Sequence, residues 1–427
     1  MLNQCHRDSV FKMASAFVLI AFVCLFRAVN NELLCESGFC RTYGFDFGCS
    51  APLQHCRINN ATHAGIWMPS PTECNCCEYC LPVYSEGHHC SLGGPGEGTG
   101  IGRCGDGLTC VEEDDGSYCR RMVTECHKAQ DEYDLRYENG EVGALEERPV
   151  CDAKGNFGIL NCVPTQTCYC QSEEGHRIFG EVLYLGASTI QNTPCGCSRM
   201  NEKIKKMISP GVPHPVIGPR CTSDGNFNPV QCYNRTCFCV NVLTGQIRLD
   251  EKVDLDEEPI TELSCYDPDL DLFPELSEGD APYNYLTPCY EDMMWKINLI
   301  EESADAGYIM DFYNSVPECL FDGTYGRIVE TTNGSKICVD PRGDQIGDYE
   351  AQPTTPEYED MNCNCALTTL VMESLYEKPI CCKNGNFRKI QCRRGKCHCV
   401  DENGGQITQE ASTVTSLSCY TENWRSC

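Results

Sequence analysis

Apolar residues in this chain form short stretches with the periods of short helices and strands. After three of the cysteines, apolar positions recur at spacings of three and four, over residues 199–208, 293–301 and 366–376. This period predicts short amphipathic helices with one face against a core. Short strands are predicted around the Gln-Cys and Cys-x-Cys-Val segments. The pattern therefore predicts small, mostly irregular units with short strands and short helices.

A longer apolar run lies near the start of the chain. Residues 13–26 are apolar and follow Arg7 and Lys12. The run is too short to span a bilayer and has the layout of a secretory signal peptide, with cleavage near Ala28. A retained signal anchor is the alternative. We expect residues 1–28 to be a signal peptide, and the mature protein to be secreted and to have no membrane span.

One cysteine-containing pattern recurs four times. In its best-formed copy, residues 221–240, a Gln-Cys pair precedes a Cys-x-Cys-Val core. Variants cover residues 151–170 and 382–400, and an eroded form that lacks two cysteines covers residues 319–339. A spacing that repeats within one chain indicates a small module in several copies.

The cysteine content indicates how such modules would be held together. The chain has 38 cysteines in 427 residues, close to the level that indicates a disulfide scaffold in a secreted protein. Loss of the signal peptide would remove Cys5 and Cys24 and leave an even number, so that all the rest can pair. Three acceptor triplets for N-glycosylation, at Asn60, Asn234 and Asn333, agree with the secretory route. We expect an extracellular glycoprotein made of small disulfide-rich domains.

The formal net charge of -29 argues against nucleic acid or anionic lipid as a partner, because both require clustered Lys and Arg. Two acidic stretches, residues 250–288 and 348–360, are predicted to be a solvated linker and a similar acidic insertion. Residues 267–276 resemble a run of calcium ligands. However, they lack the glycine turn and the terminal bidentate glutamate of an EF-hand loop, so we favour a linker there.

The block of residues 35–119 contains twelve cysteines and can close on itself. Zinc binding by its densest part is the alternative, but an oxidising compartment favours disulfides. The glycine-rich residues 91–102 are predicted to be a flexible tether. The block resembles the N-terminal domain of insulin-like growth factor binding proteins in the order of Cys74-x-Cys76-Cys77-x-x-Cys80, Gly87-x-x-Cys90, Arg103-Cys104 and Gly107-Leu108-x-Cys110.

The recurring pattern resembles thyroglobulin type-1 repeats, most closely at Gln231-Cys232 with Cys237-x-Cys239-Val240 and at Gln391-Cys392 with Cys397-x-Cys399-Val400. The family usually has Trp between the two close cysteines, where this chain has Tyr169, Phe238 and His398. Copies 1 and 2 would be joined by Gly196 alone, so we expect them to pack tightly. The resemblance divides the chain into copy 1 (126–195), copy 2 (197–265), an acidic linker (266–288), a degenerate copy 3 (289–363) and copy 4 (365–427).

The resemblance also implies that cysteines pair in sequence order within each copy. The implied bridges are Cys126–Cys151, Cys162–Cys168, Cys170–Cys195, Cys197–Cys221, Cys232–Cys237, Cys239–Cys265, Cys289–Cys319, Cys338–Cys363, Cys392–Cys397 and Cys399–Cys419. Copy 3 lacks the third and fourth cysteines together, with Glu330 and the region 335–336 in their place. One missing bridge predicts lower stability by about 2–4 kcal/mol.

Copy 4 has two cysteines beyond the usual six. The simplest assignment pairs one of Cys381 and Cys382 with Cys427. A vicinal bridge between Cys381 and Cys382 and a bond from Cys427 to another chain are the alternatives.

The sequence shows no catalytic motif. It has no His-Glu-x-x-His and no Gly-x-Ser-x-Gly, and every cysteine has a possible disulfide partner. His88-His89 has no spaced companions, which favours a solvent-facing pair over a metal site. We expect a binding protein rather than an enzyme, with no cofactor and no metal.

The resemblance implies inhibition of papain-like cysteine proteases. Some type-1 domains, the thyropins, insert a wedge of disulfide-held loops into the protease cleft, and rigid loops lose little entropy on binding. The implied contacts are the first-loop tips and the Cys-x-Cys-Val loops. In copy 2 these are Pro210, Val212 and Pro213, with Tyr233 and Arg235 beside them. A glycan at Asn234 would block this surface.

Two other functions fit the same residues. The N-terminal block implies binding of insulin-like peptides or growth factors through exposed aliphatic side chains, here Ile101, Leu108 and Val111. The acidic residues 112–115 directly after them reduce the expected apolar patch. The third function is an extracellular matrix or secreted interaction scaffold without inhibitory activity.

Overall fold

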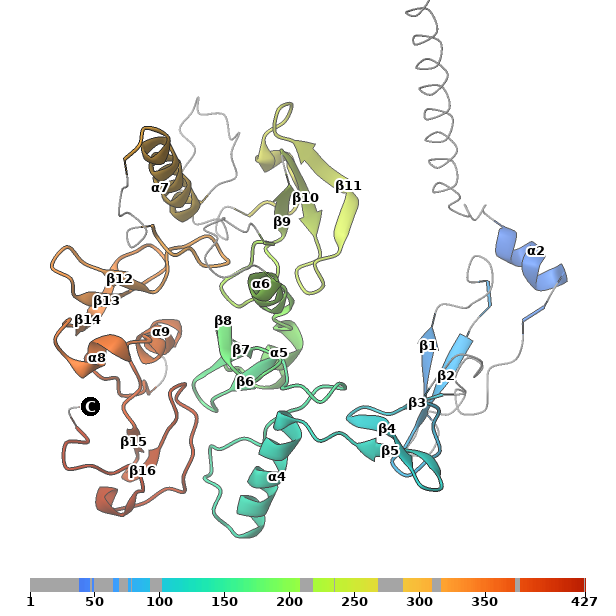
Figure 1. Ribbon diagram of the computed structural model, residues 1–427, viewed down its shortest axis with the longest axis horizontal. Helices are drawn as coiled ribbons and strands as arrows, with labels where there is room; N and C mark the ends of the chain where they lie inside the picture. The colour runs from blue at the N-terminus through green and yellow to red at the C-terminus, as the bar shows by residue number, and fades with distance from the viewer. Residues whose placement is uncertain are drawn as a thin grey trace, which may run out of the picture. The chain divides into compact units, whose positions relative to one another are not determined.

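The chain divides into two units, residues 1–121 and 122–427, and Figure 1 labels the described elements of both. Among the described residues, no helix is long and apolar enough to cross a membrane. The predicted signal peptide, residues 93–101 of the glycine-rich tether and residues 268–286 of the acidic linker lie outside the described residues. The computed structural model describes residues 38–46, 48–49, 64–68, 76–77, 79–92, 102–207, 218–233, 235–267, 287–308, 316–372, 377–425 and 427.

The described part of the first unit contains one short helix and small sheets. Strands β1 and β2 are antiparallel, β2 and β3 are parallel, and β4 and β5 form a hairpin. Its elements are α2 (Phe39–Asp46), β1 (Ala64–Met68), β2 (Tyr79–Tyr84), β3 (Arg103–Cys104), β4 (Leu108–Glu113) and β5 (Gly116–Arg121).

Disulfides hold the first unit together. Cys80 is in a disulfide, as are Cys76 and Cys77. Because Cys76, Cys77 and Cys80 are all oxidised, none of them offers the thiolate that a zinc site requires. The bridges are Cys40–Cys76, Cys49–Cys77, Cys90–Cys110 and Cys104–Cys119.

Each copy in the second unit has a helix at its first cysteine and a small antiparallel sheet after it. The helices predicted over residues 199–208, 293–301 and 366–376 are confirmed as α6, α7 and α9, within the residues that are described there. The helices are α4 (Glu125–Glu138), α6 (Gly196–Met207), α7 (Pro288–Asp305) and α9 (Asn364–Val371). Shorter helices are α5 (Ala187–Asn192), η2 (Ile260–Glu262), α8 (Pro356–Glu359) and η4 (Val414–Ser416).

The predicted strands around the Gln-Cys and Cys-x-Cys-Val segments are confirmed. In the second unit, the central strand of each three-stranded sheet carries the Cys-x-Cys segment or, in copy 3, its remaining cysteine. The strands are β6 (Leu160–Cys162), β7 (Thr167–Gln171) and β8 (Arg177–Leu183) in copy 1; β9 (Val230–Tyr233), β10 (Thr236–Val240) and β11 (Ile247–Asp254) in copy 2; β12 (Ile328–Glu330), β13 (Lys336–Val339) and β14 (Gln345–Ala351) in copy 3; and β15 (Ile390–Arg393) and β16 (Lys396–Cys399) in copy 4.

The prediction that residues 348–360 form a solvated acidic insertion is wrong. Strand β14 pairs with β13 as β8 pairs with β7 and β11 with β10. Tyr349 and Tyr358 pack on the core formed by Ala351 and Met361. The stretch is held to the core by these apolar side chains, whereas its many acidic residues had led to the prediction of an exposed insertion. For the same reason residues 250–254 belong to β11 and not to a linker.

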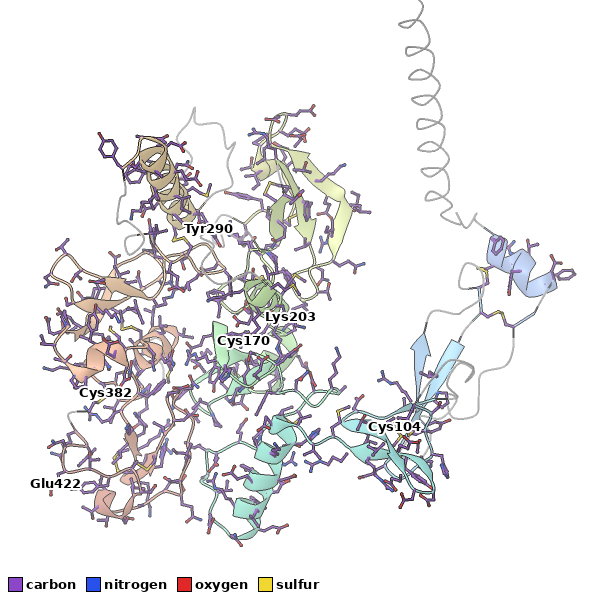
Figure 2. The ribbon with its side chains drawn as sticks, in the orientation of Figure 1. Cys104, Cys170, Lys203, Tyr290, Cys382 and Glu422 are labelled. Carbon is purple, nitrogen blue, oxygen red and sulfur yellow. A yellow bond between two sulfur atoms is a disulfide. The ribbon has the colours of Figure 1, made fainter. Side chains whose placement is uncertain are left out.

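Sulfur atoms from each copy account for much of the buried core, and the prediction of small disulfide-rich domains is confirmed. The structure brings together all ten cysteine pairs that the resemblance implies (Figure 2). In copy 4, Cys365 is bonded to Cys381 and Cys382 is bonded to Cys427. Cys381 and Cys382 therefore do not bond each other.

The two pairs of adjacent copies meet through the same contact. In the junction between copies 1 and 2, the Sγ atom of Cys170 lies against Gly225, whose φ is +87°. In the junction between copies 3 and 4, the Sγ atom of Cys338 lies against Gly385, whose φ is +75°. A Cβ atom on either glycine would come within 2.4 Å of the sulfur. Copies 1–2 and copies 3–4 are thus two equivalent tandems.

Candidate functional site: the copy 2 hairpin

A short hairpin in copy 2 places the first candidate residues. Strand β9 ends at Tyr233 and β10 begins at Thr236, so only two residues form the turn. Cys232 lies directly opposite Cys237, and a disulfide joins them with a Cα–Cα distance of 4.0 Å. A bridge one position below the turn restricts the conformations of the tip before any partner binds.

The side chain of Gln231 fastens the base of this hairpin. Its Oε1 atom accepts a hydrogen bond from the backbone N–H of Arg220 (2.9 Å). Its Nε2 group donates to the carbonyl oxygens of Arg220 (2.7 Å) and Asn228 (2.9 Å). The chain leading to Cys221 is therefore tied to β9 by both ends of one amide.

Gln391 makes the equivalent three hydrogen bonds in copy 4. It accepts from the backbone N–H of Ile380 and donates to the carbonyl oxygens of Ile380 and Arg388, each at 2.8 Å. In the sequence the Gln-Cys pair is only a marker of the repeat, and this role of its glutamine was not predicted. The signal was the glutamine itself, which stands before the third cysteine in both copies.

Tyr233 projects from the fastened hairpin, with 79% of its surface exposed. Arg235 is less free, because its Nη2 atom lies 2.5 Å from Oδ1 of Asp256. Its carbonyl oxygen also accepts a hydrogen bond from the N–H of Leu255 (2.9 Å). The tip therefore presents an exposed aromatic ring beside an arginine that is held in an ion pair.

The other hairpins differ from that of copy 2. In copy 1, Val163 is buried, and Oγ1 of Thr165 accepts a hydrogen bond from Nη1 of Arg393 in copy 4 (2.6 Å). The hairpins of copies 1 and 4 therefore contact each other. In copy 3, Glu330 and Lys336 lie opposite each other where the other copies have the bridge. Among the described hairpins, only that of copy 2 combines a bridge with an exposed aromatic side chain at its tip.

Several predicted site residues lie outside the described part of the chain, namely Pro210, Val212, Pro213, Ile101, Asn60 and Asn234. The predicted glycosylation site Asn333 is described and exposed, in the turn between β12 and β13. Its Oδ1 atom accepts hydrogen bonds from the backbone N–H (3.1 Å) and the hydroxyl (2.8 Å) of Ser335. Glycosylation at the three asparagines stays a prediction.

In the first unit, the predicted aliphatic surface is small where it is described. Leu108 is half-buried in β4, and Val111 is 38% exposed. Beside Val111, Glu113 accepts two hydrogen bonds from Arg120, of 2.6 and 2.8 Å. These hydrogen bonds lower the pKa of Glu113. A charged pair therefore borders the one exposed aliphatic side chain of this predicted set that is described.

The histidine pair in the same unit lies against aromatic rings. The imidazole of His88 stacks on Tyr84, with centroids 6.2 Å apart, and that of His89 is 4.3 Å from the ring of Tyr118. Both histidines are exposed.

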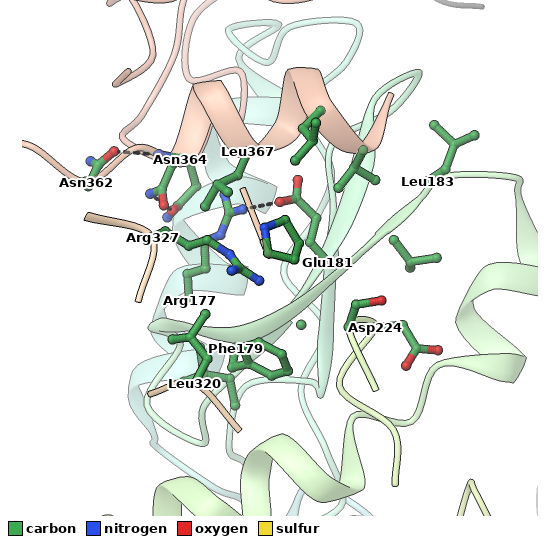
Figure 3. A pocket seen from close by; sticks show the side chains of 18 of the residues that line it. Arg177, Phe179, Glu181, Leu183, Asp224, Leu320, Arg327, Asn362, Asn364 and Leu367 are labelled. Carbon is green, nitrogen blue, oxygen red and sulfur yellow. Dashed lines mark hydrogen bonds and ion pairs between the residues drawn. The ribbon is translucent and has the colours of Figure 1, made fainter. Parts of the chain in front are cut away.

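A cavity of about 840 Å³ lies within the second unit (Figure 3) and was not predicted from the sequence. Strand β8 and helix α9 line it, together with Asp224 of copy 2 and Leu320 of copy 3. In its wall Nη2 of Arg177 lies 2.6 Å from Glu181, and the hydroxyl of Thr368 in copy 4 donates to Glu181 at 2.7 Å. No single motif could predict this cavity, because all four copies contribute to its lining.

The family model for the thyroglobulin type-1 repeat matches residues 197–257 and 369–419. The chain contains thyroglobulin type-1 repeats. The two matched segments lie in copies 2 and 4, each of which is the second member of a tandem. Because the copy 1–copy 2 junction and the copy 3–copy 4 junction have the same contact, the type-1 repeats occupy equivalent places in the two tandems.

Curated relatives resemble parts of the chain. Bovine thyroglobulin is 30% identical over 94 residues, which is 22% of this chain and 3% of that protein. Equistatin of Actinia equina is 29% identical over 102 residues, 24% of this chain and 42% of that protein. Nidogen-2 of Mus musculus is 27% identical over 121 residues, 25% of this chain and 9% of that protein. The chain thus covers only a small part of thyroglobulin and less than half of equistatin.

Proposed function

We propose that the protein is a secreted, thyropin-like inhibitor of papain-like cysteine proteases that acts through the copy 2 hairpin. The observation that carries the proposal is Tyr233, which is 79% exposed on a hairpin held by the Cys232–Cys237 bridge and by the three hydrogen bonds of Gln231. An aromatic anchor on a preorganised loop loses little conformational entropy when it enters a cleft.

Three findings support this function. Copy 2 is one of the two segments matched by the type-1 family model, and the resemblance to that family implies inhibition of these proteases. The chain matches 42% of the length of equistatin. The many disulfides are typical of a protein that works in an oxidising, extracellular compartment. The two matches support a binding module, and the disulfides support its place outside the cell.

The test is inhibition of a papain-like protease by the mature protein, residues 29–427, made through the secretory pathway. We expect Tyr233→Ala to raise the inhibition constant by about 30-fold, since loss of a buried aromatic anchor costs about 2 kcal/mol. The matched control is Tyr137→Ala, at an exposed tyrosine on α4 of copy 1. Equal inhibition by the Tyr233 variant and the control, or no inhibition by either the unaltered protein or its Asn234→Gln variant, would reject the proposal.

The predicted glycan gives a second arm to the experiment. Asn234 directly follows Tyr233 in the chain, and a glycan at this predicted acceptor would block the surface. Inhibition by Asn234→Gln protein alone would keep the hairpin as the site and make the glycan its regulator. Binding of an insulin-like peptide by the same preparation, without protease inhibition, would instead favour the growth-factor alternative. If the protein shows neither protease inhibition nor peptide binding, the interaction scaffold remains as the function.

A further inference from the structure

Copy 4 contains a run of cations in a chain that is otherwise strongly acidic. From residue 378 to residue 396 there are seven Lys and Arg side chains and no Asp or Glu, although the net charge of the whole chain is -29. The global charge therefore conceals a local basic segment. The seven are Lys378, Lys383, Arg388, Lys389, Arg393, Arg394 and Lys396.

The fold gathers four of these cations at one end of the β15–β16 hairpin. Arg393 and Lys396 lie directly opposite each other, and Arg394 is the first residue of the two-residue turn between them. Nε of Arg393 lies 2.6 Å from Oε2 of Glu377, which places the neighbouring Lys378 at the same end. We call Lys378, Arg393, Arg394 and Lys396 the basic tip.

Little negative charge compensates the basic tip. Among the described residues, Glu377 is the one carboxylate within ion-pair distance of these four side chains. Nζ of Lys396 donates instead to the neutral hydroxyl of Ser412 (2.8 Å). Lys378, Arg394 and Lys396 are exposed. Because like charges directly opposite on a hairpin destabilise it, the Arg393–Lys396 pair is unfavourable for the protein alone.

The backbone at Arg394 is a second, independent observation. Arg394 has φ +50° and Gly395 has φ +77°, so both central residues of the turn are left-handed. Such turns favour Asn, Asp or Gly at the first position, and the corresponding residue in copy 2 is Asn234. Non-glycine residues in this conformation are unfavourable and cluster at functional sites. An arginine here costs stability and adds an exposed cation.

We propose that the basic tip binds a linear sulfated polysaccharide. Closely spaced Lys and Arg side chains attract such a polymer because binding releases its counterions, and Arg donates pairs of hydrogen bonds to anionic oxygens. The patch is narrow and the rest of the chain is acidic. A thin polymer can contact it alone, whereas a membrane or a nucleic acid duplex presents a broad negative surface, which a chain with a net charge of -29 repels. This inference is independent of protease inhibition.

The experiment measures binding of the mature protein to heparin in 150 mM salt by titration calorimetry. We expect binding that weakens steeply with salt and disappears with chemically desulfated heparin. The double variant Arg394→Asn, Lys396→Gln should bind about 25-fold more weakly, about fivefold for each cation removed near a polyanion. Its matched control is Lys154→Gln with Arg342→Gln, which removes two exposed cations from copies 1 and 3.

Three results would overturn the proposal. The first is no binding of heparin by the unaltered protein. The second is equal loss of affinity in the double variant and its control. The third is equal or tighter binding of polyglutamate, anionic phospholipid vesicles or duplex DNA, which would assign the basic tip to another class of partner. Far-ultraviolet circular dichroism and thermal unfolding of both double variants check that they are folded.

Discussion

At the scale of single residues, two glycines hold the tandems together. Gly225 and Gly385 leave room for the sulfur atoms of Cys170 and Cys338 from the preceding copy. Both glycines also have positive φ, a conformation that costs other residues about 1–2 kcal/mol. The nearby sulfur atom leaves no space for a Cβ atom, and the positive φ disfavours any residue other than glycine. Both positions therefore require glycine.

Gly225→Ala should therefore lower the free energy of unfolding by about 3 kcal/mol or more, since backbone strain and overpacking both contribute. The control is Gly395→Ala. Gly395 also has positive φ, but its Cβ would meet no atom within 4 Å, so only the backbone cost of about 1 kcal/mol is expected. Denaturant unfolding of both variants checks the difference. Equal losses would show that the contact with Cys170 contributes nothing.

A second residue-scale prediction concerns pH. A hydrogen bond from Lys206 (2.7 Å) lowers the pKa of Glu174 to about 2 and links copies 1 and 2. A lowered pKa stabilises the fold above the unfolded pKa of about 4.3, and this contribution is lost as the pH falls towards 2. Because both side chains are about half exposed, solvent screening limits the contribution to about 0.5 kcal/mol.

Glu174→Gln should accordingly be less stable than the unaltered protein at pH 6, and equally stable at pH 2. Unfolding free energies measured between these values check the trend. The control is Glu258→Gln, at an exposed carboxylate. A difference for Glu174→Gln that persists at pH 2 would contradict the assignment to this ion pair.

At the scale of elements, the β12–β13 hairpin of copy 3 has kept its geometry without its bridge. Glu330 and Lys336 occupy the cross-strand position that Cys162 and Cys168 occupy in copy 1. Nζ of Lys336 donates to the carbonyl oxygen of Tyr358 (3.1 Å) and lies over its ring. Contacts with helix α8 thus replace part of what the covalent link supplies elsewhere.

The double variant Glu330→Cys, Lys336→Cys should form the missing disulfide. A loop of this length should stabilise copy 3 by about 2 kcal/mol, less the lost contacts of Lys336 with Tyr358. Peptide mapping without reduction shows whether the bond forms, and unfolding before and after reduction gives its effect. The single variant Lys336→Cys controls for the loss of the lysine. Two free thiols in the folded double variant would contradict the observed register.

At the scale of the whole second unit, copies 1 and 4 meet although they are far apart in sequence. The N–H of Leu145 donates to Oε1 of Gln406 (3.0 Å), and that of Ala144 donates to Oε1 of Glu410 (2.9 Å). Beside them Gly143 has no room for a side chain, because its Cβ would lie 2.0 Å from Nε2 of Gln406 and 2.6 Å from the carbonyl oxygen of Thr408.

Gly143→Ala should loosen this contact and leave the bridges within each copy intact. A clash of this kind costs about 1–3 kcal/mol. Hydrogen exchange at the amides of Ala144 and Leu145 should become faster, while amides inside β7 and β16 keep their protection. Glu141→Ala, at an exposed position nearby, is the control. Unchanged exchange at both amides would show that copies 1 and 4 do not meet in solution.

The sequence predicted what depends on local spacing and missed what depends on contacts between copies. The recurring cysteines led to the resemblance that implies the order of pairing, and the three- and four-residue periods predicted α6, α7 and α9. Arg199 shows what spacing cannot predict. Its guanidinium donates to carbonyl oxygens of copy 1, among them those of Gln171 and Phe157, at 2.7 Å each. In the sequence, nothing distinguishes Arg199 from the other charged residues of its helix.

The candidate site was predictable only in part, for the same physical reason. The bridge between Cys232 and Cys237 below Tyr233 is implied by the resemblance to the type-1 repeats, and a tyrosine at a turn is expected to be exposed. The mutual contact of the copy 1 and copy 4 hairpins depends on how the copies pack. Because of this packing, Thr165 and Arg393 contact each other, while Tyr233 faces solvent.

Bridges that pair in sequence order also determine how each copy responds to mechanical force. Among the described residues of the second unit, every bridge stays within one copy. Force applied along the chain would therefore separate copies 1 and 2 without breaking a covalent bond. Within copy 2, the bridges leave only residues 222–231 and residue 238 to be straightened. The fully extended length of these residues is about 40 Å, whereas that of the whole reduced copy is about 230 Å. The copies would behave as short, stiff links in a chain under tension.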